Sequence, residues 1–598
     1  MTANGTAPAT WGERLSAAAP GLAALTSYRA RWLPKDVTAG LVLTALLVPQ
    51  GMAYAELAGL PAITGLYTSI LCLVGYAIFG PSRILVLGPD SSLGPMIAAT
   101  ILPLVAANGD PARAVALASA LALLAGAITV LAGVCGLGFV ADLISKPTMI
   151  GYLNGLALTI LVGQLPKLFG FSVDASGFVG EAAGFVRGVA EGATVPAALA
   201  VGGLGLVAIV ALQRTLPKVP AVLVVVVLSI VATAALGLGA HGVDAVGALP
   251  QGFPPFTIPY IGLSDLPLLL AGALGIAVVS LADTISTSSA FAARAGRTVD
   301  GPREMTGIGA ANIAAGLFQG FPVSTSGSRT AVAEQAGAKT QVTGLVGAAA
   351  ITLILVFVPG LLRDLPQPTL AAVVIAASFS LADVPGTIRL FRVRRTEFTL
   401  SVAAFLGVVL LGVLPGIALA VALSIANVFR RAWWPYQAVL GRVPGMPGFH
   451  DVRSYPHAER LPRCVLFRFD APLFFANART FREQVSALAL SDPPPTWVIV
   501  AAEPITDVDT TAADMLHELD CALNAQDVHL VFAELKDPVR EKIERYELTR
   551  TIDPAHFFPT IDAAVAAFRS MTGAGWRQAG VEKAPESPAE ESERGGTG

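Results

Sequence analysis

The apolar pattern of this chain is interrupted twice in the same way, at Leu87-Gly-Pro-Asp-Ser-Ser-Leu-Gly94 and at Gly320-Phe-Pro-Val-Ser-Thr-Ser-Gly-Ser-Arg-Thr330. In each stretch glycine and proline stop regular structure, and a serine-rich start of a new helix follows, so that N–H groups and hydroxyls gather at a helix N-terminus. One such break is typical of a kink in a packed helix, with serines bonded to the preceding turn. Two breaks in corresponding places predict interrupted helices that meet at a binding site.

The composition around these breaks is that of a membrane protein. The 598 residues are 54% hydrophobic and 14% charged, with a mean hydropathy of +0.66, whereas a soluble domain carries about 25% charged residues. Apolar stretches of about 20 residues, enough to cross a bilayer, recur between Val37 and Arg431 and predict roughly twelve to fourteen spans. The stretch 398–426 is long enough for two spans broken at Pro415-Gly416.

Basic residues in the short loops predict the orientation. They gather before the first span, after the span that contains Asp283, and near the end of the apolar region, at Arg29, Arg31, Lys35, Arg294, Arg297, Arg303, the run Arg389–Arg395 and Arg430-Arg431. The positive-inside rule places all of them, and both termini, in the cytoplasm of a multi-pass protein in the cell (plasma or inner) membrane. No cleaved signal peptide is expected. A net charge of −3 gives no sign of a nucleic-acid partner.

After Trp434 the composition becomes that of a soluble domain. Strands are expected at 464–469, 496–501 and 528–533 and helices at 480–488 and 511–523, and this alternation predicts a sheet covered by helices. The acidic, proline-rich end of the chain predicts disorder. The expected organisation is an N-terminal segment 1–36, a transport domain 37–432, a linker 433–461, a soluble domain 462–572 and a disordered tail 573–598.

Charged residues inside the apolar region mark the candidate site, because a charge at mid-bilayer costs about 2.5–3.5 kcal/mol. Asp90 and Arg329 open the two broken helices, and Asp283 stands alone in an apolar span with Thr287 on the same helix face. An anion held by Arg329 and two helix N-termini would be repelled by both aspartates unless protons or metal cations offset them. Oxygens at Asp283 and Thr287 suit Na⁺ or a proton; the alternative is that Asp283 only bonds a neighbouring helix.

Several motifs resemble those of the SulP anion permeases, a family of sulfate and bicarbonate carriers that includes prestin. The matching stretches cover most of the apolar region; they are Val48-Pro-Gln-Gly-Met-Ala-Tyr54, Gly59-Leu-Pro61, Gly65-Leu-Tyr67, Phe79-Gly-Pro-Ser-Arg83, Gly88-Pro-Asp90, Ala141-Asp-Leu-Ile-Ser-Lys-Pro147, Ser326-Gly-Ser-Arg-Thr330 and Gly337-Ala-Lys-Thr-Gln341. The C-terminal domain resembles a STAS domain at Thr506-Asp-Val-Asp-Thr-Thr511.

The resemblance implies a membrane α-helical fold of fourteen transmembrane helices in two inverted repeats of seven, split into core and gate domains, with a cytoplasmic α/β STAS domain. It implies an elevator motion, a homodimer in membrane lipid, and STAS regulation that allows a protein partner. It places substrate-binding residues at Gln50, Tyr54, Asp90, Ser91, Ser326, Gly327, Ser328 and Arg329. Cation coupling falls to Asp90, Asp283, Thr287 and Thr325, with Na⁺ held by Asp283 and Thr287. Asp90 stands where sodium-coupled relatives have a neutral hydroxyl, which favours proton coupling or altered cation handling over a copy of the Na⁺ site.

The sequence therefore predicts secondary active transport of sulfate, bicarbonate or a dicarboxylate, coupled to H⁺ or Na⁺, with no other cofactor. Three alternatives stay open: an uncoupled anion channel or exchanger, a membrane-anchored anion sensor that signals through the STAS domain, and a nucleobase carrier, which Arg329 disfavours. No catalytic constellation is found, since all six histidines lie outside the helices expected to line the site. The chain is not expected to be an enzyme.

Overall fold

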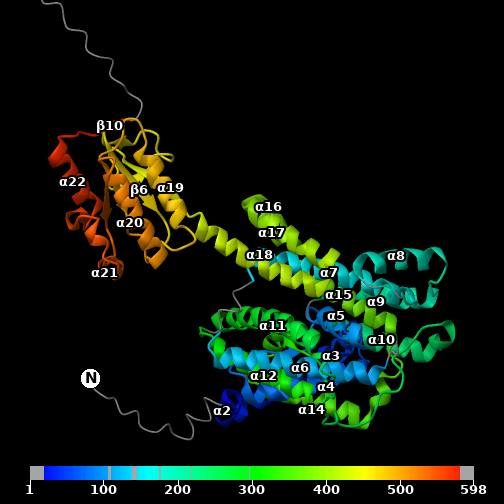
Figure 1. Ribbon diagram of the computed structural model, residues 1–598. Helices are drawn as coiled ribbons and strands as arrows, with labels where there is room; N and C mark the ends of the chain where they lie inside the picture. Colours follow the sequence, from blue (N-terminus) through cyan, green and yellow to red (C-terminus); the bar gives the residue numbers. More distant parts are fainter. Residues whose placement is uncertain are drawn as a thin grey trace, which may run out of the picture. The chain divides into compact units, whose positions relative to one another are not determined.

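The computed structural model describes residues 19–105, 110–137, 144–173, 175, 177–216, 219–294 and 296–578. Part of the Ala141–Pro147 motif and most of the predicted disordered tail lie outside these ranges. The chain forms two compact units, residues 1–425 and 426–598, which are considered separately (Figure 1). Within the described residues of the first unit, helices dominate, and eight helices of the chain are long and apolar enough to cross a membrane. Three shorter apolar helices accompany them.

The first unit consists mainly of two helix groups. The first group packs α12 against α6 and α4, and α14 against α3; its elements are α3 (Leu33–Leu57), α4 (Ala62–Phe79), β1 (Leu87–Gly88), α5 (Gly94–Val105), α6 (Pro111–Val134), α11 (Leu266–Arg294), α12 (Gly301–Gly316), β2 (Ser324–Thr325), α13 (Gly327–Gln335) and α14 (Val342–Phe357). The second group packs α15 and α17 against α7; its elements are α7 (Lys146–Phe169), α8 (Gly177–Ala190), α9 (Pro196–Thr215), α10 (Ala221–Leu236), α15 (Gln367–Leu381), α16 (Val384–Val393) and α17 (Arg395–Leu406).

Small residues allow the helices to approach closely, as is usual where no hydrophobic force drives membrane helices together. A Cβ atom on Gly65 of α4 would lie 1.9 Å from the carbonyl oxygen of Gly51 in α3. The two helices can therefore cross at this point only with glycine at position 65. This crossing fixes the end of α3 that carries Gln50 and Tyr54.

The last apolar stretch is broken at a different place from the one predicted. Helix α17 continues as a π-helical turn, η6 (Gly407–Leu411), and α18 (Val413–Trp433) starts after Gly412. Gly412 has φ 98°, which glycine adopts without strain. Pro415 lies inside the first turn of α18, where its missing N–H costs no helical hydrogen bond. The sequence predicted the break at Pro415-Gly416, but the break lies at Gly412, three residues before Pro415, so that prediction was wrong.

The second unit is an α/β domain built on one sheet. The strand order is β10-β5-β3-β6-β7-β8-β9, with β6 to β9 parallel and β3 antiparallel to β6. The elements are β3 (Gln437–Arg442), β4 (Phe449–Asp451), β5 (Glu459–Arg460), β6 (Cys464–Phe469), α19 (Ala478–Ala489), β7 (Trp497–Ala501), α20 (Thr510–Asn524), β8 (His529–Ala533), α21 (Asp537–Arg545), β9 (Phe557–Phe558), α22 (Ile561–Thr572) and β10 (Arg577–Gln578). The strands and helices expected between residues 464 and 533 agree with these within two residues.

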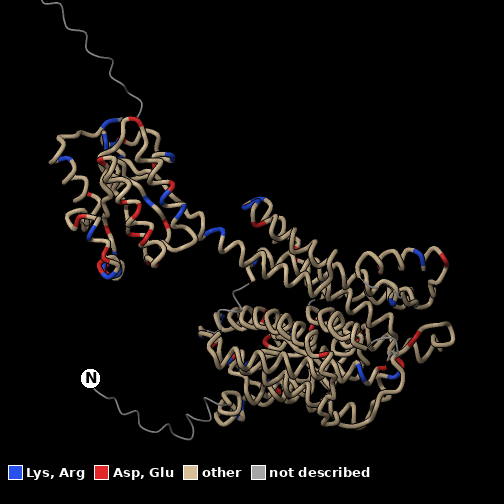
Figure 2. The backbone as a smooth tube through the Cα atoms, viewed as in Figure 1, with Lys and Arg blue, Asp and Glu red and all other residues tan. Residues whose placement is uncertain are grey.

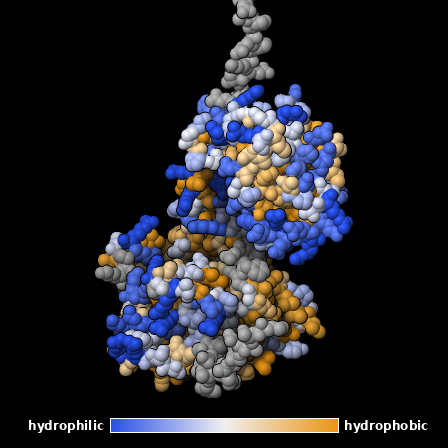
Figure 3. Space-filling model, turned by 90° about the vertical axis from the view of Figure 1, so that its left-hand side faces the viewer, coloured by the Kyte–Doolittle hydropathy of each residue, from blue (hydrophilic) through white to orange (hydrophobic). Residues whose placement is uncertain are grey.

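Alternate side chains of the strands bury on opposite faces, against α19, α20 and α21 on one side and α22 on the other. Residues 433–461, expected from the sequence to be a linker, contribute β3, β4 and β5 to this sheet. Alternate residues of β3, Ala438 and Leu440, are buried against the sheet core, so this segment is structured. On the face shown in Figure 3, hydrophilic residues predominate over this unit and surround one apolar patch.

Candidate anion site

A cavity of about 570 Å³ lies between the two helix groups. The first group contributes the apolar residues Leu46, Val279, Ala282 and Val332. It also contributes most of the polar lining, from α3, α11, β2, α13 and the turn after β1, namely Gln50, Tyr54, Asp90, Ser91, Ser92, Asp283, Ser286, Thr325, Ser326, Gly327, Ser328 and Arg329. The second group contributes mostly apolar residues from α7, α10 and α15, together with Gln213 and Ser380. Most of the polar lining therefore belongs to one helix group, whereas the wall that the other group supplies is mainly apolar.

The two sequence breaks meet at this cavity. Strand β1 pairs antiparallel with β2, with Leu87 opposite Thr325 and Gly88 opposite Ser324. After each strand the chain turns into a short helix, α5 or α13, and Ser91 and Ser328 both line the cavity. The two helices therefore start beside one another, and their N-terminal N–H groups converge on the same space.

Arg329 is the most deeply buried charged group of the site, with 1% of its surface exposed. Its Nη1 donates a hydrogen bond of 2.7 Å to the carbonyl oxygen of Pro89. Its Nε and Nη2 have no hydrogen-bond partner. A buried guanidinium with unused donors is costly, and these donors are available to an acceptor that enters the cavity.

Glycine at position 88 makes room for Arg329. A Cβ atom there would lie 3.1 Å from Nη1 of Arg329 and 3.2 Å from the Leu47 side chain. The glycine therefore lets the guanidinium lie against the β1 backbone and reach Pro89.

Asp90 caps the start of the first short helix. Its Oδ1 accepts hydrogen bonds from the backbone N–H of Ser92, at 2.9 Å, and from the Ser92 hydroxyl, at 2.6 Å. Its Oδ2 lies 3.8 Å from Nη2 of Arg329. Asp90 thus offsets part of the positive charge that the helix N-terminus and Arg329 create.

Asp283 faces the same cavity from α11. Its Oδ2 accepts a hydrogen bond of 3.1 Å from the hydroxyl of Ser324. Thr287 is not among the cavity-lining residues, but it lies next to the site, since a Cβ atom on Gly327 would come within 3.9 Å of its side chain. Thr325 donates a long hydrogen bond of 3.5 Å to Thr284. Among the described residues, no group of three acidic, histidine or cysteine side chains forms a metal-binding cluster.

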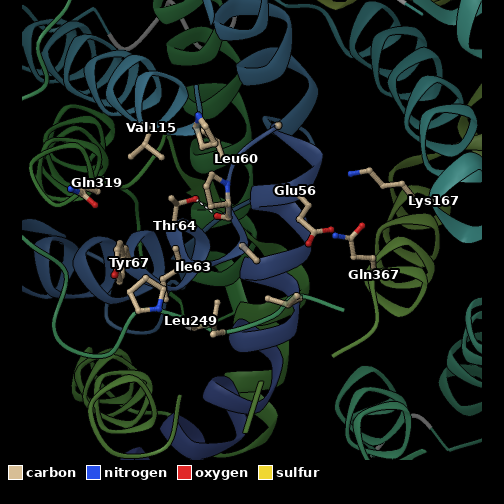
Figure 4. A pocket seen from close by; sticks show the side chains of 18 residues that line it. Glu56, Leu60, Ile63, Thr64, Tyr67, Val115, Lys167, Leu249, Gln319 and Gln367 are labelled. Carbon is tan, nitrogen blue, oxygen red and sulfur yellow. Dashed lines mark hydrogen bonds between the residues drawn. The ribbon is translucent and has the colours of Figure 1, made fainter. Parts of the chain in front are cut away.

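A second cavity, of about 660 Å³, lies farther along α3 (Figure 4). Glu56 of α3, Lys167 of α7 and Gln367 of α15 point toward one another there, so that the two helix groups face each other with opposite charges. Tyr54 and Glu56 are two residues apart, which separates the cavities by only a few ångströms along α3. Elsewhere in the first group, Glu334 of α13 pairs with Arg294 of α11 at 3.6 Å and is 39% exposed, so it faces away from both cavities as an ordinary surface ion pair.

Some site residues carry no signal in the sequence. Ser324 lies in a predicted break, but nothing in the sequence distinguishes it as the donor to Asp283. The Pro89 carbonyl is a backbone group, which no side-chain pattern reveals. The wall that the second group supplies is mainly apolar and includes Met149, Leu153 and Val373. In the sequence, these residues cannot be told apart from residues that face lipid.

Comparisons with known proteins agree with each other. The model of the sulfate permease family matches residues 33–404, and that of the STAS domain matches residues 455–564. A probable sulfate transporter of Mycobacterium tuberculosis is 41% identical over 552 residues, covering 92% of this chain and 98% of that protein. High affinity sulfate transporter 2 of Stylosanthes hamata is 29% identical over 566 residues, covering 90% and 84%.

Solved structures share the fold. The murine Slc26a9 anion transporter in its inward-facing state has a TM-score of 0.85 at 22% identity, covering 95% of this chain and 96% of that one. The transmembrane domain of the cyanobacterial bicarbonate transporter BicA has a TM-score of 0.58 at 22% identity, covering 66% and 98%. The predicted membrane-helical transporter fold with a C-terminal STAS domain is confirmed at this level.

Proposed function

Because this chain belongs to the sulfate permease family, a family of transporters and not of enzymes, we propose that it carries an oxyanion, sulfate first among the candidates, across the membrane by secondary active transport coupled to H⁺. The observation that carries the proposal is the buried guanidinium of Arg329, whose Nε and Nη2 lack partners beside two helix N-termini. Sulfate, bicarbonate and dicarboxylates all offer the oxygens that such donors bind. The names of the relatives favour sulfate.

The substrate lies between the helix N-termini, with Ser91, Ser326 and Ser328 as hydroxyl donors and Gly327 leaving room at the start of α13. Gln50 and Tyr54 contact it from α3. All six residues line the cavity. The apolar wall of the second group excludes water from the opposite side, which strengthens the electrostatic attraction.

The charges of the site explain the coupling. Arg329 brings one positive charge to the cavity, whereas Asp90 and Asp283 bring two negative charges when ionised. A dianion therefore binds well only when a cation neutralises a carboxylate. Asp90 is already held by Ser92 and lies near Arg329, so Asp283 takes the proton. Na⁺ bound by Asp283, Thr287 and Thr325 is the alternative, and it requires more oxygen ligands than these side chains supply.

Transport follows from relative movement of the two helix groups. Because each wall of the cavity belongs to one group, sliding the first group as a core past the second as a gate carries the substrate without breaking the polar wall. The proposal includes this elevator motion and a fold of fourteen spans in two inverted repeats. It also includes a homodimer, with both termini and a regulatory STAS domain in the cytoplasm. The pairing of β1 with β2 supports the repeats, since equivalent breaks meet antiparallel. Electroneutral entry of a dianion requires at least two co-transported cations, and each uncompensated charge costs about 2.3 kcal/mol per 100 mV of membrane potential.

Uptake by the purified chain in liposomes tests the proposal. Labelled sulfate, bicarbonate and a dicarboxylate are offered in turn while pH and Na⁺ gradients are varied independently. The expected result is accumulation of sulfate that follows the pH gradient and saturates. Currents that ignore both gradients would establish a channel, and anion binding without movement would establish a sensor; either result contradicts secondary active transport.

A further inference from the structure

An apolar groove of about 430 Å³ lies within the second helix group, apart from both cavities. It is formed by α7, α15, α16 and α17, and its walls include Leu158, Leu161, Phe379, Val402 and Phe405. Its polar lining residues are Asn154, Ser378, Thr387 and Ser401, and the first three already make hydrogen bonds. Asn154 donates to the Thr387 hydroxyl at 2.8 Å and accepts from the Asp383 N–H at 2.7 Å. The groove therefore offers hydrocarbon surface and fits an apolar chain.

Helix α16 borders this groove and is amphipathic. Val384, Ile388 and Phe391 are exposed at i, i+4 and i+7 on one helix face. Arg392 lies one turn after Ile388 at the edge of this face, and Arg389 lies one turn before Arg392. Phe391 packs edge-on against Phe398 of α17, with ring centroids 5.1 Å apart, and so holds α16 against the groove. A helix with exposed apolar side chains next to arginines is typical of one that lies in the membrane interface.

The charge at this end of the groove is strongly positive (Figure 2). Arg389, Arg392, Arg394 and Arg395 are all exposed. Arg394 contacts Glu397 at 3.2 Å, and Asp383 is occupied as the cap of α16, where it accepts from the Gly386 N–H. Within the described ranges, Arg389, Arg392 and Arg395 have no carboxylate partner. These three guanidinium groups can therefore pair with an anionic group from outside the chain.

We infer that the groove binds one anionic phospholipid, with an acyl chain between α7 and α17 and the phosphate against Arg389 and Arg392. Arginine suits this ligand because its planar fork binds phosphate oxygens in pairs. Basic residues on an amphipathic helix at the cytoplasmic surface are the usual recognition element for such lipids. The juxtaposition of an acyl-sized apolar groove with unpaired arginines distinguishes this site from a general apolar surface. It does not depend on which anion the chain transports.

Lipid titration of the full chain in detergent tests the site. Phosphatidylglycerol and phosphatidylcholine are added separately to delipidated protein, and bound lipid is counted by native mass spectrometry. Phosphatidylglycerol should bind the wild type more tightly. Arg389→Gln with Arg392→Gln should weaken its binding about thirtyfold, equivalent to about 1 kcal/mol per arginine, and leave phosphatidylcholine unaffected. The matched control is Arg453→Gln with Arg460→Gln, at two exposed arginines of the second unit. This variant should bind both lipids as tightly as the wild type does.

A groove-filling change tests the acyl chain separately. Ala382→Trp places a large side chain in the groove and should reduce binding of both lipids, while the arginines remain. Val402→Phe serves the same purpose if the first variant does not elute as a single species. Equal phosphatidylglycerol binding by the wild type and the arginine variant would overturn the proposal. The proposal would also be overturned if the arginine variant bound lipid normally but changed its oligomeric state, or the protease protection of its second unit. In that case the arginines would contact protein and not lipid.

Discussion

Nη2 of Arg329 lies 3.8 Å from Oδ2 of Asp90, while Nη1 of the same guanidinium donates to the carbonyl oxygen of Pro89. The charge pair thus joins the two interrupted helices at the wall of the cavity, which Arg329 and Asp90 both line. At 3.8 Å the pair makes no hydrogen bond. An entering oxyanion can therefore take the unused donors without first breaking a hydrogen bond to Asp90.

Arg329→Lys is expected to weaken sulfate binding about 10- to 100-fold. Lysine keeps the positive charge but loses the paired donors, and a hydrogen bond to a charged group contributes about 1.5–3 kcal/mol. Equilibrium binding of labelled sulfate to purified protein measures the effect. Arg303→Lys, at an arginine with 50% exposure in the same helix group, is the control and should bind normally. Wild-type affinity in Arg329→Lys would show that the charge alone suffices.

Asp283→Asn is expected to uncouple transport from the pH gradient. The asparagine oxygen can still accept from Ser324, so the local structure is kept, but the side chain no longer binds a proton. Accumulation should fall about tenfold for each pH unit and each lost proton, whereas sulfate exchange between equal concentrations should persist. Asp300→Asn, at an exposed helix cap, should leave both measurements unchanged. Unaltered pH dependence in Asp283→Asn would assign the proton to another group.

The sequence revealed the polar half of the site because glycine, proline and serine act locally. A break in a helix can be recognised from the residues that cause it, and a charged residue stands out in an apolar span. The contact of Arg329 with Pro89 could not be predicted, because it depends on two-residue strands that have no periodicity. Residues 437–442 were missed as a strand because their partner, β6, follows more than twenty residues later.

Lys167 and Glu56 are expected to tune access to the second cavity in opposite directions. With alternating access, this cavity becomes the entrance on one side of the membrane, and a positive side chain there raises the local anion concentration. Lys167→Gln should raise the KM for sulfate about three- to tenfold with little change in kcat, and Glu56→Gln should lower it. Uptake kinetics at low and high salt measure both effects. The KM of the double variant should lie closer to that of the wild type than the KM of either single variant does. If neither substitution changes the KM, the two charges do not tune access to this cavity.

Asp520 in α20 is expected to make the STAS domain less stable as pH rises. Burial raises the pKa of its carboxyl to about 6, partly countered by the hydrogen bond from Asn524 and by the charges of His529 and His517. Because the folded domain holds this proton more tightly than the unfolded chain does, the stabilisation is complete below about pH 4 and is lost as pH rises through about 6. Asp520→Asn should therefore stabilise the domain by roughly 1–2 kcal/mol at pH 7.5, after allowance for solvent screening, and have little effect at pH 4.5. Hydrogen exchange of the β8 amides in the full chain, compared with wild type at each pH, measures the difference. Asp514→Asn, on the exposed face of the same helix, should show no such dependence on pH, and equal protection of the two variants at pH 7.5 would contradict the assignment.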